Sequence, residues 1–511
     1  MKTLLITSAI LLAQAGIASA AEPKSDSSQM KGHHHMPGMD MSKPMDHSKM
    51  KIDGTHDMKS MTPPDSPPAE MPGMDRSGPM DHSTMNMGAP DDVMPAMPAD
   101  SNPAADHSTM QMGEAHDMHS MGAMNGMYGA YPMTREASGT SWQPDSSPHE
   151  GIHRMVGDWS MMVHGFANTI YDRQGGPRGD TKTFSTSMLM VMGQRNVANG
   201  TLGFRSMFSL DPLMGKSGYP ELFQTGETAD GMSHLTDQQH PHDLLMELAA
   251  TYSVPLSDDS SVFGYVGLPG EPALGPAAFM HRFSGIDNVE APISHHWLDS
   301  THITYGVTTL GYVYKNWKIE GSAFHGREPD QFRYNIESGR LDSNAIRLTY
   351  NPTTNWSSQV SYGHIKSPEA LTPDVNVNRT TASVTANMPY GANNWQTTLA
   401  WGRNAPSRGD ASNAYLLESA LTLGKTHTFF GRGEVLDKDE LFANTPGSPL
   451  AGKSFKIGKI SAGYIYDLPT SGHYKTGIGG LVSRYSIPSD LTSTYGNNPT
   501  SFMLFLRMKI Q

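Results

Sequence analysis

The chain has 511 residues, with 37 Lys and Arg against 50 Asp and Glu, which gives a formal net charge of −13. This acidic balance excludes a nucleic-acid binder that relies on a basic surface. The chain contains no cysteine, which excludes a disulfide framework, a lipid-modified N-terminal cysteine and thiolate metal sites, blue-copper centres included. Any metal chemistry must therefore use His, Met, Asp or Glu.

The first twenty residues have the pattern of a secretory signal peptide. Lys2 precedes an apolar run over residues 4–17, and Ala18-Ser19-Ala20 forms a small-residue cleavage site. The run is too short to span a membrane as a helix, and no later stretch of about 18 apolar residues follows. We expect an exported chain whose mature form starts at Ala21.

Residues 21–150 differ in composition from the rest of the chain. They hold 22 of the 37 methionines, 10 of the 23 histidines and a charge balance of −11, against −3 for residues 151–511. Few aliphatic or aromatic residues lie between Glu22 and Met127, so this segment cannot bury enough apolar surface to offset its chain entropy. The composition predicts a disordered tail and linker over residues 21–150.

The tail is repetitive. MPGMDMSKPMDHSKM at 36–50 recurs as MPGMDRSGPMDHSTM at 71–85, and ADHSTMQMG follows at 105–113. A second unit occurs as HDMKSM at 56–61 and as HDMHSM at 116–121. Ligand types that repeat without a repeating core indicate several similar, loosely ordered binding units.

The donors of these units predict copper binding. Methionine thioethers select Cu(I), imidazoles suit copper, zinc and nickel, and neighbouring Asp residues add favourable charge. One alternative is that the methionines fill gaps in a core, but the frequent Pro, Gly and Asp residues argue against it. Another is that the three consecutive histidines come from a purification tag, but their position inside a Met repeat argues against that origin. The predicted tail ligands are His33, His34, His35, Met36, Met39, Met41, Met45, His47, Met50, His56, Met58, Met61, Met71, Met74, Met80, His82, Met85, Met87, His107, Met110, Met112, His116, Met118, His119 and Met121.

After residue 150 the chain changes to short alternating segments. In residues 202–208, 317–323, 395–401 and 502–510, large apolar residues occupy one parity and polar or small residues the other. This period of two is typical of strands with one apolar face, and it places Arg507 on the inward parity.

Three Asn-Trp pairs, ending at Trp317, Trp356 and Trp395, recur at intervals of 39 residues. Each interval contains a strand, a long loop, a strand and a short turn, so each repeat is one hairpin. Tryptophans at one end of successive hairpins are typical of an aromatic girdle at a membrane interface. We therefore predict an all-β, closed outer-membrane barrel of about sixteen antiparallel strands, with a range of 14–18, over residues 151–511; a soluble β-sandwich is the alternative.

Long loops at 212–243 and 268–302 interrupt the strand pattern and keep hydrophobic anchors, so we expect them to fold into the barrel mouth or lumen. They carry candidate ligands for a second metal site that would bind copper or zinc. In this site His240 and His242 share one ion, and Asp243 is either a third ligand or the hydrogen-bond acceptor that orients a histidine. The candidates are His240, His242, Asp243, His281, His295, His296 and His302. Residues 299–302, Asp-Ser-Thr-His, contain the residue types of a serine hydrolase, a less favoured alternative.

The MDHSKM, MDHSTM and MPGMD units of the tail resemble the Met- and His-rich N-terminal regions of the copper-resistance protein B family of outer-membrane barrels. Barrel segments such as QHPHDL and HHWLDSTH are similar to uncharacterised outer-membrane proteins of metal-resistance systems. The resemblance implies copper tolerance. It carries over ligand roles to His47, Met50, His82, Met85, His107 and Met110.

These observations predict a non-enzymatic copper-binding protein of the outer membrane, whose periplasmic tail sequesters copper or hands it on. The expected partners are outer-membrane lipid, copper ions and periplasmic copper-handling proteins, with no nucleic acid. The alternatives are a porin-like channel for another solute, with an incidental metal-binding tail, and a barrel enzyme.

Overall fold

The computed structural model describes residues 125–469 and 472–510, which belong to one compact unit. The signal peptide and all the predicted tail ligands from His33 to Met121 lie outside the described residues. Among the described residues, none of the helices combines the length and the apolar character that a membrane crossing requires.

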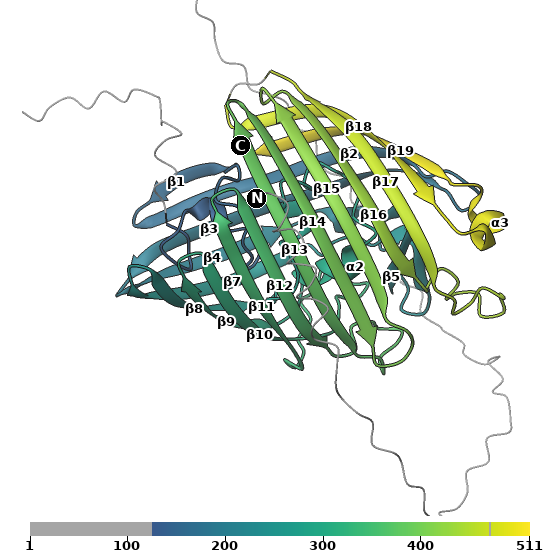
Figure 1. Ribbon diagram of the computed structural model, residues 1–511, viewed down its shortest axis with the longest axis horizontal. Coiled ribbons are helices and arrows are strands. Elements are labelled where there is room, and N and C mark those ends of the chain that lie inside the picture. Colours follow the sequence, from purple (N-terminus) through teal and green to yellow (C-terminus); the bar gives the residue numbers. More distant parts are fainter. Residues whose placement is uncertain (1–124, 470–471, 511) are drawn as a thin grey trace, which may run out of the picture. The chain divides into compact units, whose positions relative to one another are not determined.

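The main sheet is a ring of sixteen antiparallel strands in which most neighbours along the chain are also neighbours in space (Figure 1). The ring contains β2–β4 and β7–β19, and β4 pairs directly with β7. The pairing of β9 with β10 and of β19 with β2 closes the ring, so no edge is open. A seventeenth strand, β1, pairs with the start of β2, beyond the point where β19 ends. The predicted all-β barrel of about sixteen strands is confirmed.

The first ten strands are β1 Ile152–Val156, β2 Trp159–Arg173, β3 Thr181–Val197, β4 Gly200–Phe208, β5 Tyr219–Thr228, β6 His234–Gln239, β7 Leu245–Ser257, β8 Ser260–Gly267, β9 Val307–Tyr314 and β10 Trp317–Phe324. The others are β11 Ser343–Thr353, β12 Trp356–Ile365, β13 Val377–Tyr390, β14 Asn393–Pro406, β15 Ser412–Leu423, β16 His427–Lys438, β17 Phe455–Asp467, β18 Tyr474–Ser486 and β19 Thr500–Ile510. The short helices are η2 Met133–Arg135, η3 Asp211–Met214, η4 Phe279–His281, α2 His295–Leu298, η5 Ser300–His302, η6 Ser489–Leu491 and α3 Thr492–Tyr495.

The strands follow the predicted period of two. Along β10 the side chains alternate strictly between exposed and buried, so that Ile319 faces outward while Lys318 and Glu320 face the interior. Arg507 of β19 is also buried, as its parity predicts. An apolar outer face around a closed ring is the arrangement that lets a sheet cross a bilayer with every backbone group paired.

The two ends of the barrel differ. At one end the strands are joined by short turns, such as residues 315–316 and 354–355, and at the other by longer connections such as 268–306 and 439–454. Trp317, Trp356 and Trp395 all follow turns of the first end and are between 41% and 51% exposed, which confirms the predicted girdle. Short turns face the periplasm in outer-membrane barrels, so we assign the turn end to the periplasmic side.

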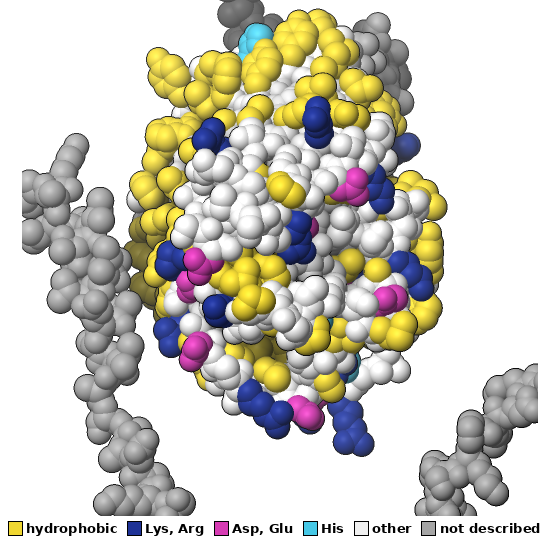
Figure 2. Space-filling view, turned by 90° about the vertical axis from the view of Figure 1, so that its right-hand side faces the viewer, with side chains coloured by type: hydrophobic (Ala, Val, Ile, Leu, Met, Phe, Trp, Pro, Cys, Tyr) yellow, Lys and Arg dark blue, Asp and Glu magenta, His cyan; other side chains and the backbone are white. Residues whose placement is uncertain are grey.

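Three chain segments fill the interior. We call residues 125–150 the first insertion, the β5–β6 hairpin at 219–239 the second, and residues 268–306 the third. Their side chains contact inward-facing residues of the wall; Lys459, for example, pairs with Glu221 of the second insertion and with Glu290 of the third. Figure 2 views the end with the long loops, where hydrophobic side chains are most continuous along the margins and Lys, Arg, Asp and Glu side chains are scattered over the face.

The insertions correct two boundaries of the sequence prediction. Residues 125–150, expected in the disordered linker, pack inside the turn end of the barrel, where Tyr128 and Trp142 are buried. Part of the expected loop at 212–243 is the paired hairpin β5–β6. Both segments fold because the barrel supplies polar and apolar partners that lie far away in the sequence.

The lipid-facing surface yields a stability prediction. Leu310 is 70% exposed on the outer face of β9, so Leu310→Arg places a charge in the hydrocarbon region and destabilises the barrel by about 2–4 kcal/mol if the site lies at the midplane. Leu213, 75% exposed in η3 of the loop end, is the matched control, and Leu213→Arg is expected to change little. Urea unfolding in phospholipid vesicles measures both; equal effects would contradict the membrane assignment of the outer face.

Candidate functional site

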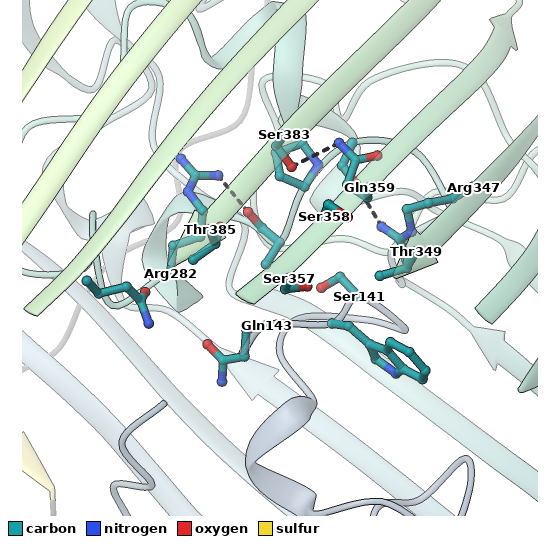
Figure 3. A pocket seen from close by; sticks show the side chains of 15 residues that line it. Ser141, Gln143, Arg282, Arg347, Thr349, Ser357, Ser358, Gln359, Ser383 and Thr385 are labelled. Carbon is teal, nitrogen blue, oxygen red and sulfur yellow. Dashed lines mark hydrogen bonds between the residues drawn. The ribbon is translucent and has the colours of Figure 1, made fainter. Parts of the chain in front are cut away.

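The interior wall opposite the third insertion is polar on β11–β14. Gln359 of β12 donates to Ser383 of β13 at 3.2 Å, and Ser361 and Thr381 share a hydrogen bond at 2.7 Å. A cavity of about 20 Å³ lies between this wall and the first and third insertions, lined by polar and charged side chains from all three (Figure 3). A volume of this size holds about one water molecule.

Buried charges connect the wall to the insertions. Arg347 of β11 pairs with Glu320 at 3.0 Å and donates to the carbonyl of Gly275 at 2.9 Å and to the hydroxyl of Thr140 at 3.0 Å. One guanidinium therefore holds both the first and the third insertion. Because a buried N–H group without an acceptor is costly, these hydrogen bonds fix the insertions in place.

Arg282 makes the corresponding contacts for the third insertion. Its guanidinium lies 2.5 Å from Asp299 and 2.7 Å from Glu418 of β15, and all three side chains are buried. Burial by itself would raise the pKa of Asp299, but Arg282 and His295 hold it well below its usual value. Asp299 is therefore an anion that organises the surrounding histidines.

Three of the predicted ligands, His242, His295 and His302, gather around Phe279. The ring centroids of His295 and His302 are 5.2 Å apart, and those of His242 and His302 are 5.4 Å apart. A cavity of about 40 Å³ adjoins this group and is lined by His242 and Phe279. The sequence distance between residues 242 and 302 concealed this grouping, which depends on how the third insertion folds.

Each ring of this histidine trio is oriented through its Nδ1 atom. His242 Nδ1 lies 2.9 Å from Asp211 Oδ2, His295 Nδ1 lies 2.7 Å from Asp299 Oδ1, and His302 Nδ1 lies 2.8 Å from the Asp299 carbonyl. The Nε2 atoms of His242 and His302 are buried without a hydrogen-bond partner within the described part of the chain. An oxygen on Nδ1 and a free Nε2 are the usual arrangement of metal-binding imidazoles.

His302 of the trio is neutral, but the three rings are not closed around an ion. Burial, reinforced by His295 and His242, lowers the pKa of His302 to about 3, so its ring carries no charge near neutral pH. Within residues 125–469 and 472–510, however, the group whose three ligand atoms lie within 4.8 Å of one another is His234, at the start of β6, with Glu369 and Glu440 in loops. The trio would have to draw together to hold one metal ion.

The remaining predicted ligands lie in other groups. His240 lies 3.2 Å from Glu227 and beside His296, whose ring centroid is 6.1 Å away, and it lines the same cavity of about 40 Å³ as His242. Asp243 faces Arg333 at 3.3 Å, and Asp211, which sequence reasoning missed, orients His242 in its place. His281 lies apart from the trio, next to His164 of β2.

The hydrolase alternative receives no support from the geometry of residues 299–302. The Ser300 hydroxyl donates to Glu328 at 3.3 Å and accepts from Arg379 at 3.0 Å. His302 uses its Nδ1 atom on the Asp299 carbonyl instead of a serine. The four residues orient one another and the wall, not a nucleophile.

No protein-family model matches the chain, and no curated protein matches its sequence. Among solved structures, an anion-selective porin from Comamonas acidovorans matches with a TM-score of 0.41 and 11% identity over 69% of this chain and 100% of its own. OprB from Pseudomonas putida, in its high-pH structure, matches with a TM-score of 0.44 and 8% identity, over 69% of this chain and 94% of its own. OmpF of Salmonella typhi in complex with daunomycin matches with a TM-score of 0.43 and 11% identity, over 70% of this chain and 100% of its own.

The closed ring of sixteen strands, its apolar outer face and its aromatic girdle define the class of the protein. It is a β-barrel of the bacterial outer membrane with the strand number of porins. Its interior differs from an aqueous channel in carrying three packed insertions.

Asp299 yields the prediction for this site. Asp299→Asn removes a buried anion that Arg282 and His295 share, and we expect the free energy of unfolding to fall by about 3 kcal/mol. This value is at the lower end of the range for a broken buried ion pair, because Arg282 keeps its second partner, Glu418. Asp259, paired with Lys315 at 3.2 Å on the surface, is the control, and Asp259→Asn is expected to change little. Urea unfolding compares the two; an Asp299→Asn effect no larger than that of the control would refute this role.

Proposed function

We propose that this outer-membrane barrel binds copper and confers copper tolerance, with the Met- and His-rich tail as the main binding region. The observation that carries the proposal is the recurrence of thioether and imidazole donors in the units at 36–50, 71–85 and 105–113. Thioethers require no deprotonation, so they keep their affinity for Cu(I) in acidic surroundings. The tail belongs to this proposal through its sequence, since it lies outside the described residues.

The first insertion supports a periplasmic position for the tail. Asn125, the first described residue, accepts a hydrogen bond at 3.0 Å from Gln194, which lies in β3 close to the turn after Val197. Met127 accepts another at 2.7 Å from Ser253, near the turn end of β7. The chain that precedes residue 125 therefore joins the barrel at the turn end, which we assigned to the periplasm.

The oriented histidine trio gives the proposal a further point of support. Imidazole nitrogens suit both copper and zinc, so the trio is a candidate second metal site that closes only when its rings move together. Outer-membrane lipid is the partner that the barrel itself requires, and periplasmic copper-handling proteins are the proposed exchange partners of the tail.

A second candidate function is a porin-like channel for another solute, and the sixteen-stranded ring favours it. In this conformation the cavities beside the insertions measure about 20, 40 and 80 Å³, which are volumes for water and not for a nutrient. In this candidate function, an insertion would leave the interior to let a solute pass.

Replacement of the tail separates the two functions. In cells that depend on this protein for copper tolerance, a length-matched tail over residues 21–124 with every Met and His changed to Ser is expected to reduce tolerance to the level of cells without the protein. The boundary is 124 because residues 125–150 are part of the barrel interior. A shift in electrophoretic mobility on heating verifies that the barrel still assembles.

The matched control is a tail whose other residues are shuffled while the Met and His positions stay fixed, and it is expected to keep full tolerance. If the donor-free tail assembles and tolerance is unchanged, the copper proposal is wrong and the channel candidate is favoured.

A further inference from the structure

The inner face of β2–β4 carries sulfur where other parts of the wall carry hydroxyls and amides. In the strand register, His164 of β2 lies opposite Met190 of β3, and Met190 lies opposite Met207 of β4. In the next inward-facing row, Met162 lies opposite Met192. These methionines are between 2% and 8% exposed.

Two of these methionines each face a histidine. His164 Nε2 lies 3.2 Å from Met190 Sδ, and Nε2 of His281, in the third insertion, lies 3.4 Å from Met207 Sδ. The two imidazole rings are 6.0 Å apart between centroids. Two nitrogens and two sulfurs from three strands and one insertion thus gather at one place.

Space for an ion adjoins these donors. A cavity of about 80 Å³ is lined by His164, Met190 and His281, together with Met162 and Met192. The same cavity reaches His149 of the first insertion, whose Nε2 atom lies 2.7 Å from Nε2 of His153. A further pair of imidazoles therefore lies between this cavity and the turn end.

We infer that His164, Met190, Met207 and His281 form a binding site for a soft monovalent metal ion, Cu(I) or Ag(I), inside the barrel. Two thioethers and two imidazoles are neutral, soft donors that disfavour hard cations such as Mg²⁺ and Ca²⁺. The carboxyl groups of Glu136 and Glu150 line the same cavity, together with the guanidinium of Arg205.

Methionine as a filler of irregular gaps is the competing explanation. A filler requires only that the side chain occupy volume, whereas here both sulfurs face a ring nitrogen within 3.4 Å. Methionine also fills space elsewhere in this barrel: Met503 of β19 is fully buried among apolar residues of another cluster, such as Ile170 and Phe505. Met503 is therefore the matched control for volume without metal binding.

This inference shares the soft-metal chemistry of the proposed function but depends on different residues. One spectrum of the methionine methyl groups therefore tests the interior site and the tail separately. Full-length protein labelled with 13C at the methionine methyl groups is titrated with Ag(I), and with Cu(I) under anaerobic reducing conditions, in detergent micelles. Met190→Leu, Met207→Leu and Met503→Leu, which conserve volume, assign the three signals.

The expected result is a shift of the Met190 and Met207 methyl signals on addition of either ion, no shift with Zn(II), and no shift of the Met503 signal. In His281→Gln the shift of the Met207 signal is expected to disappear. If tail signals shift while the Met190 and Met207 signals stay unchanged, the interior site is refuted and the tail proposal stands. If the two interior signals shift and the tail signals do not, the proposed role of the tail fails and the interior site stands.

Discussion

The pairing of buried charges across the barrel interior is the constraint on which the rest of this structure depends. A closed sheet in lipid exposes its apolar face outward, so polar and charged side chains accumulate inside and must be paired there. Lys459 meets this requirement only because the insertions supply Glu221 and Glu290. Arg347 pairs with Glu320 of the wall and completes its hydrogen bonds on Thr140 and Gly275 of the insertions. The barrel and its contents are therefore one folding unit.

This packing divides the interior into regions with different chemistry. The wall on β11–β14 offers hydroxyls and amides, which hold the insertions through hydrogen bonds. The wall on β2–β4 offers thioethers, with His164 and His281 facing them. The histidine trio lies between loop segments, with each ring fixed by an oxygen on Nδ1. Soft donors thus occur in the barrel as well as in the tail, and each region is separable by mutation.

The architecture was predictable from the sequence because its signals are local. Alternation along segments such as 317–323 reflects the two faces of a strand, and the Trp317, Trp356 and Trp395 spacing reflects one hairpin per repeat. The inward position of the β3 methionines was not predictable. Residues 188–192 read Met-Leu-Met-Val-Met, so both parities are apolar, and only strand pairing shows that Leu189 faces outward while Met190 faces inward.

The candidate sites depended on contacts between distant segments. Asp211 orients His242 across 31 residues, and Arg205 of β4 donates to the carbonyls of Ala137 and Gly139 in the first insertion. The first insertion has the composition of a linker. Its Tyr131 and Trp142 contact each other, while Tyr128 finds its aromatic partner in Phe263 of β8. Donor types were therefore evident from the sequence, whereas their grouping required the fold.

We infer that the insertions and their buried ion pairs close the lumen of the sixteen-stranded barrel. Single-channel recording of the full-length protein in planar lipid bilayers checks this closure. Reconstituted barrels, verified by their heat-modifiable mobility, are expected to show no steady open-pore conductance at moderate voltage. A stable, large conductance of the kind expected from an open sixteen-stranded pore would contradict it.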